Sequence, residues 1–89
     1  MSQFLLLLKK KWLKLMPKLP IVSGKDLVKA FAKIGYEKDH QTGSHIILRH
    51  INPPHRRLTI PNHKEISKGT LRAIIRQAGL SRDEFFEIV

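Results

Sequence analysis

The side chains best suited to acid–base chemistry in this sequence are five histidines, all between positions 40 and 63. They lie in a strongly basic stretch, because the segment from Lys38 to Arg76 holds eight lysines and arginines against two acidic residues. Histidine exchanges protons near neutral pH, and the cationic side chains hold phosphate groups. This combination favours chemistry or binding on RNA.

A metal site is the main alternative for the histidines, since His40, His45, His50 and His55 recur at every fifth position. On strands that interval alternates between the two faces of a sheet, so the four side chains cannot converge as a tetrahedral set. No acidic residue accompanies them at ligand spacing. We therefore expect no metal and no other cofactor.

His45 has the surroundings most suited to catalysis, because it ends the motif Gly43-Ser44-His45. The glycine allows a tight turn and a close approach of the backbone to a phosphate. Strand alternation places His45 on the same face as Arg49 and opposite Ile46 and Leu48. The ring could accept the ribose 2′-hydroxyl proton or deliver a proton to the leaving 5′-oxygen. The alternative is that His45 is only a polar residue at the edge of a strand.

The residues expected to contact RNA are basic or hydrogen-bonding and lie in or near this stretch. They are Lys38, Ser44, Arg49, Arg56, Arg57, His63 and Lys68. His63 could equally be a solvated turn residue, and His40, His50 and His55 are interpreted as exposed positions.

The local sequence predicts one helix, three strands and two more helices. Ser23 and Asp26 resemble a capping box before an apolar helical stripe that Gly35 ends. Strands are expected over residues 36–41, 44–50 and 57–61, with turn residues between them. A helix over about residues 68–78 ends at Gly79, and Ser81 opens a short final helix through a second capping box.

These elements predict an α+β fold resembling a double-stranded-RNA-binding domain, ordered α-β-β-β-α. Three consecutive strands with short loops form an antiparallel sheet, whose one apolar face both main helices must cover. The chain's 89 residues allow one domain, and its lack of cysteine excludes disulfides and thiolate chemistry. Its net charge of +10 favours a polyanionic partner.

Residues 1–19 are interpreted as a basic amphipathic N-terminal extension, and residues 20–89 as the compact domain. An apolar run from Phe4 to Leu8 precedes three lysines, the reverse of the order in a secretory signal. The run is also far shorter than the ~20 residues that span a bilayer. We expect a cytoplasmic protein without obligate membrane association. The alternatives for this extension are a membrane-surface helix, a contact for a partner, or an over-long translated start.

Four segments in order, over about residues 20 to 86, resemble the HicA toxin family, also called YcfA-like. They are Ser23-Gly24-Lys25 with the helix to Gly35-Tyr36, Gly43-Ser44-His45, Ile60-Pro61-Asn62-His63, and Lys68-Gly69-Thr70-Leu71 with Arg76-Gln77-Ala78-Gly79. The resemblance implies an RNA-binding-like fold, mRNA cleavage with His45 as the active-site histidine, and neutralisation by a HicB-type antitoxin. The stretch to Leu19 and the loop Asn52-Pro53-Pro54-His55 depart from the family pattern.

Three functions remain open at this point: a metal-independent endoribonuclease toxin, a non-catalytic RNA-binding module of the same fold, or a membrane-surface peptide with a small domain attached. The third rests only on residues 4–16. In the first case an acidic antitoxin is expected to cover His45 by meeting a single basic face. That face is expected to include the arginines at positions 49, 56, 57, 72 and 76.

Overall fold

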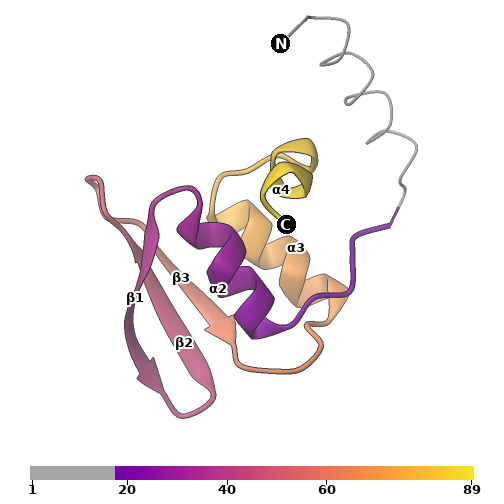
Figure 1. Cartoon of the computed structure of the whole chain (residues 1–89), viewed down its shortest axis with the longest axis horizontal. Coiled ribbons are helices and arrows are strands. Elements are labelled where there is room, and N and C mark those ends of the chain that lie inside the picture. The colour runs from indigo at the N-terminus through magenta and orange to yellow at the C-terminus, as the bar shows by residue number, and fades with distance from the viewer. Residues whose placement is uncertain (1–17) are drawn as a thin grey trace, which may run out of the picture.

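The computed structural model of the 89-residue chain describes residues 18–89. The expectations for residues 1–17 lie outside the described residues. The elements in chain order are α2 (Gly24–Ala32), β1 (Tyr36–Thr42), β2 (His45–His50), β3 (Arg57–Pro61), α3 (Lys68–Gln77) and α4 (Arg82–Ile88). One sheet forms one layer, and α2 and α3 lie together against one of its faces (Figure 1). The predicted α+β order and the single covered face are confirmed.

Both predicted capping boxes are present and fix where α2 and α4 begin. The Ser23 hydroxyl accepts from the Asp26 backbone N–H at 3.0 Å, and the Asp26 carboxylate accepts from the Ser23 backbone N–H at 3.0 Å. The hydrogen bond from the Ser23 backbone holds the pKa of Asp26 below its usual range. Ser81 and Glu84 repeat this pair of bonds at the start of α4. Each box satisfies backbone donors that a helix leaves unpaired at its first turn.

The sheet is an antiparallel meander in the order β1-β2-β3. Between β2 and β3, Ile46 pairs with Ile60 and Leu48 with Leu58. All four side chains are buried, and they line the face that the helices cover. Between β1 and β2 the register shifts at Asp39, which forms a β-bulge between Lys38 and His40.

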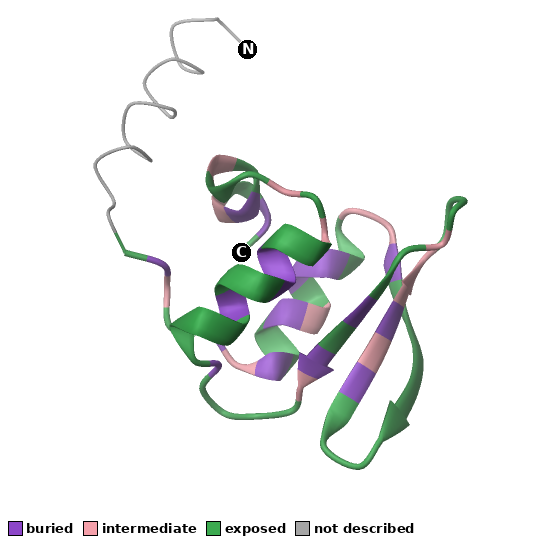
Figure 2. Cartoon of the chain, turned by 180° about the vertical axis from the view of Figure 1, so that it is seen from behind, coloured by how far each residue is buried: buried purple, intermediate pink, exposed green. Residues whose placement is uncertain are grey.

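The core lies between this inner sheet face and the three helices. Its largest fully buried side chains include Phe31 from α2, Leu71 from α3 and Phe85 from α4. Phe31 packs edge-on against Tyr36, with ring centroids 5.5 Å apart. Burial alternates along β2 and β3, so the second face of the sheet carries the exposed residues of these strands (Figure 2). We call this second face the outer face.

The segment before α2 also packs onto the core. Leu19 and Val22 are buried, and the Val22 carbonyl accepts from the Ile66 backbone N–H at 2.8 Å. The packed unit therefore includes Leu19, one residue before the domain start expected from sequence. Within residues 18–89, no helix has the length and apolar character needed to cross a membrane.

Candidate functional site

His45 is the first residue of β2 and its side chain is exposed. It pairs with Thr42 on β1 and with Pro61 on β3, which places it in the middle of the sheet at one end. The next residue, Ile46, is buried under the helices, so His45 points to the outer face. His45 therefore has the orientation predicted from strand alternation.

The turn that presents His45 is held by a short chain of hydrogen bonds. Lys38 Nζ donates to Gln41 Oε1 at 3.1 Å, and Gln41 Nε2 donates to the Gly43 carbonyl at 3.1 Å. Gly43 has a φ of 58°, a conformation that glycine adopts without strain. On the other side of the turn, the Asn62 backbone N–H donates to the Ser44 carbonyl at 2.6 Å. These bonds fix the backbone on both sides of Ser44, directly before His45.

The start of α2 reaches the same end of the sheet. The Gly24 backbone N–H donates to the His63 carbonyl at 2.9 Å, which ties α2 to the loop after β3. A Cβ atom at Gly24 would collide with the Pro61 carbonyl oxygen, so only glycine permits this approach. His63 itself is exposed in this loop. His45, Ser44 and His63 are thus carried by segments that meet at one end of the sheet.

A basic hollow of about 300 Å³ lies beside this end, on the helix side of the sheet. Three lysines line it, Lys25 and Lys29 from α2 and Lys38 from β1, together with Asn62. Lys38 was selected from sequence, whereas Lys25 and Lys29 were not. Their spacing of four residues at the start of a helix, which puts both on one side, was the available signal.

Two arginines face each other on the outer face. Arg49 on β2 pairs directly with Arg57 on β3. Like charges directly opposite in a sheet repel, while Glu37 on β1 lies opposite Arg49 on its other side. His45 lies four residues from Arg49 along β2, or about 13 Å at the usual rise of a strand.

A second histidine joins His45 on the outer face. His40 pairs with Ile47, whose side chain lies on the same face as His45, two residues further along β2. The His40 Nδ1 lies 2.8 Å from Asp39 Oδ2. This hydrogen bond is the largest cause that lowers the pKa of Asp39, and the charges of Arg57 and Arg49 add to it. Asp39 and His40 therefore belong to the same charged surface as the arginine pair.

A protein-family model described as "HicA toxin of bacterial toxin-antitoxin" matches residues 24–80, more than half of the chain. The chain belongs to the HicA toxin family. The match runs from the start of α2 to the turn after α3, so it contains all three strands and the turn before His45. A comparison with curated proteins finds no match. The resemblance drawn from the sequence motifs is confirmed, and membership of this family implies a toxin–antitoxin pairing.

Two of the residues selected for RNA contact lie elsewhere in this HicA toxin. Arg56 Nη1 donates to the Gln77 carbonyl at 3.1 Å, so its guanidinium lies at the end of α3. A Cβ at Gly79 would collide with the same guanidinium. Lys68 begins α3 and faces a different hollow, described below. Neither residue shares the outer face with His45.

His50 and His55 are half-buried, which corrects their interpretation as exposed positions. His50 Nε2 lies 2.8 Å from the Ile34 carbonyl, and the Asn52 backbone N–H donates to His50 Nδ1 at 3.0 Å. Because Nδ1 accepts from Asn52, Nε2 is the nitrogen that donates to the Ile34 carbonyl. His55 Nδ1 lies 3.1 Å from the His50 carbonyl. Both rings therefore hold the loop between β2 and β3, and both His50 nitrogens are engaged in hydrogen bonds.

The prediction that the arginines form a single basic face is also wrong. Arg49 and Arg57 lie on the outer face, whereas Arg72 and Arg76 line a hollow on α3, which covers the opposite face. The helices separate the two sets, and no flat partner surface can meet both. As for metal ligands, no group of three or more histidine or acidic side chains gathers anywhere in residues 18–89.

Proposed function

We propose that this HicA toxin is an endoribonuclease that cleaves mRNA by metal-independent chemistry, with His45 as its catalytic histidine. The observation that carries the proposal is the position of His45. Its ring is exposed on the open face of the sheet, directly after a turn fixed by hydrogen bonds from Gln41 and Asn62. A rigid backbone under a free imidazole is the arrangement that proton transfer to a bound substrate requires.

The reaction that fits is an attack of the ribose 2′-oxygen on the adjacent phosphorus. A base removes the 2′-hydroxyl proton while the bond from that oxygen to phosphorus forms. The bond from phosphorus to the 5′-oxygen breaks, and an acid gives that oxygen a proton. The products are a 2′,3′-cyclic phosphate and a 5′-hydroxyl end. One proton leaves the substrate and one returns, so imidazole groups and cations are sufficient.

The cations on both sides of His45 are suited to hold the RNA backbone. The facing Arg49 and Arg57 would bind a phosphate further along the backbone than the one attacked, because Arg49 lies about 13 Å from His45 along β2. Lys25, Lys29 and Lys38 would bind backbone phosphates on the helix side of the turn. RNA crossing the end of the sheet would therefore meet cations before and after the catalytic histidine.

His40 is the best candidate for the second proton-transfer group. Its Nδ1 is held by the Asp39 carboxylate, which leaves Nε2 to face the substrate. Diagonal neighbours on adjacent strands lie roughly 7–8 Å apart. The attacking and leaving oxygens lie on opposite sides of phosphorus, and each needs a group at a hydrogen-bond distance of about 2.8 Å. Two imidazoles on neighbouring strands suit that geometry better than one.

Incubation of the purified toxin with a short RNA in excess chelator tests the proposal. We expect cleavage that leaves a cyclic phosphate, and no cleavage of the same RNA with a 2′-deoxyribose at the cut position. Activity that vanishes in chelator and returns with a divalent ion would contradict the metal-independent chemistry. A gel shift with intact RNA would instead support the non-catalytic RNA-binding module.

A further inference from the structure

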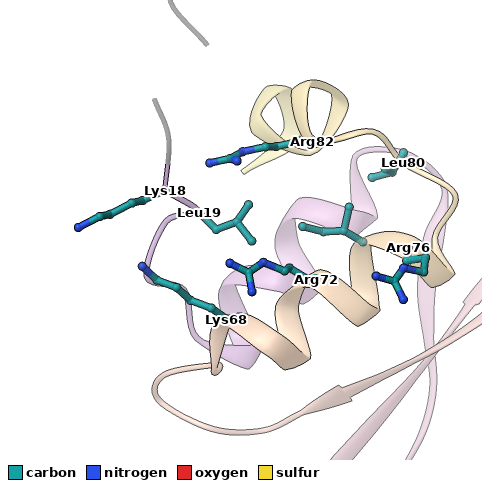
Figure 3. Close-up of a pocket in the computed structure, with 8 residues that line it drawn as sticks. Lys18, Leu19, Lys68, Arg72, Arg76, Leu80 and Arg82 are labelled. Atoms are coloured by element: carbon teal, nitrogen blue, oxygen red, sulfur yellow. The ribbon is translucent and has the colours of Figure 1, made fainter. Parts of the chain in front are cut away.

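A second basic site lies on the helical side of the molecule. A hollow of about 400 Å³ is formed by α3, the segment before α2 and the start of α4 (Figure 3). Leu19, Ile75 and Leu80 provide its apolar surface. Its basic lining residues are Lys18, Lys68, Arg72, Arg76 and Arg82. We call this hollow the α3 groove.

Three of these cations form a row along one side of α3. Lys68, Arg72 and Arg76 follow each other at intervals of four residues, which places them on one side of a helix, about 6 Å apart along its axis. Figure 3 shows them along the edge of the groove, with Leu19 pointing into the space between α3 and α4. Among residues 18–89, no acidic side chain lines the groove.

The chain itself supplies no acid to neutralise this row. In the part of the chain that the structure describes, no ion pair involves Lys68, Arg72 or Arg76. The sequence of residues 1–17 contains four lysines and no aspartate or glutamate. A segment of that composition would add positive charge, so charge complementarity favours an acidic occupant for the groove.

We propose that the α3 groove binds an acidic amphipathic segment of a partner protein. Carboxylates of that segment would pair with the row on α3, and an apolar side chain would enter the hollow against Ile75 and Leu80. A helix laid in such a groove places its anchors at the same interval of four residues.

An RNA strand suits the groove less well. Single-stranded nucleic acid is bound through a basic track together with aromatic side chains on which bases stack. None of the described residues that line the α3 groove is aromatic, and its aliphatic surface provides no hydrogen-bond donor to a phosphate. The combination of a charged row and an aliphatic floor therefore favours a protein segment.

The position of the groove gives this contact a distinct consequence. α3 covers the inner face of the sheet, whereas His45 and the facing Arg49 and Arg57 lie on the outer face. A segment in the groove would hold a partner to the toxin without covering His45. This inference does not depend on RNA cleavage, because it concerns binding at a surface that the proposed reaction does not use.

A peptide-binding experiment tests the groove. The probe is a fluorescein-labelled helical peptide of about 15 residues, near the shortest length at which an isolated helix persists. It carries glutamates at intervals of four residues, and leucines on the adjoining side of the helix. A control peptide of the same charge has glutamine in place of leucine. Both are titrated into the full-length toxin by fluorescence anisotropy, and backbone NMR shifts locate the site.

We expect the leucine peptide to bind more tightly than the glutamine peptide. It should shift the amide resonances of α3 and of Leu19. The double substitution Arg72→Ala with Arg76→Ala should weaken it about fivefold to tenfold, since each exposed ion pair contributes less than a factor of ten. Arg49→Ala with Arg57→Ala removes the same charge from the outer face. This matched control should change the affinity less than twofold.

Three outcomes would overturn the proposal. The leucine peptide could fail to bind, or bind no better than the glutamine peptide. The two double variants could weaken binding equally, which would mean that net charge alone attracts the peptide. A uridine oligonucleotide could lose more affinity in the Arg72 and Arg76 double variant than in the control variant, which would identify the groove as an RNA site.

Discussion

Replacing His45 with alanine should remove catalysis and leave the fold intact. The side chain is exposed on the outer face, so its loss opens no cavity in the core. Its effect on the free energy of unfolding should be no more than about 0.5 kcal/mol, as for other surface changes. Loss of a proton-transfer group lowers a rate by ~10²–10⁴-fold, equivalent to about 2.7–5.5 kcal/mol of transition-state stabilisation. RNA binding should persist, because it rests on lysine and arginine.

His50→Ala is the matched control, with the opposite expected pattern. It deletes the hydrogen bonds to Ile34 and Asn52 and the edge-on ring contact with Tyr36 at 4.8 Å. At about 0.5–1.5 kcal/mol for each of the three, the loss in stability should be roughly 1.5–4.5 kcal/mol. Each kcal/mol lowers the melting temperature of so small a domain by about 4–8 °C. Cleavage per folded molecule should stay close to that of the unmodified chain.

The assay combines thermal unfolding with RNA cleavage measured well below the melting temperature of both variants. We expect His45→Ala to be stable and inactive, and His50→Ala to be destabilised and active. His45→Ala that keeps more than a tenth of the cleavage rate would refute the catalytic assignment. His45→Ala that melts as early as His50→Ala would show that the exposed ring has a structural role.

Three further outcomes follow from the geometry. Gly24→Ala should cost about 1–3 kcal/mol in thermal unfolding, because its Cβ meets backbone, whereas Gly69→Ala meets nothing within 4 Å and should not destabilise. Asp26→Ala should lower the free energy of unfolding at pH 7. The pKa of Asp26 in the folded chain lies below 3.8, so the stability that its carboxylate provides is lost as the pH falls through that lower value. The urea midpoints of the variant and the unmodified chain should therefore converge in acid. Arg49→Ala and Arg57→Ala should each weaken RNA binding and reduce the salt dependence of the affinity by about one phosphate contact, with no loss of folding stability; unchanged salt dependence would place the RNA elsewhere.

The local signals in the sequence were sufficient for the elements and for the orientation of His45. Ser23 and Ser81 specified their helix starts through side-chain chemistry that operates within three residues. Alternation along β2 also assigned Ile46 and Leu48 to the core. By the same alternation His50 shares their face, so its partial burial was predictable from parity although it was not predicted.

The position of His40 could not be obtained in this way. Strict alternation from the buried Tyr36 would put His40 on the inner face of the sheet. The bulge at Asp39 adds one residue to β1 and reverses the faces beyond it, which brings His40 to the side of His45. The division of the arginines between two surfaces has a similar cause. It depends on which layer each element joins, and that is a property of the packed chain.

The same bulge also affects how the molecule behaves beside copies of itself. β1 and β3 are both edge strands, and an unprotected edge is a template for the strand of another chain. On β1 the bulge at Asp39 and the exposed polar side chains disturb that template. β3 is short and ends in Pro61, which has no N–H to donate. Pairing between the edge strands of two molecules is thereby opposed at both edges, although one whole face of the sheet stays open for function.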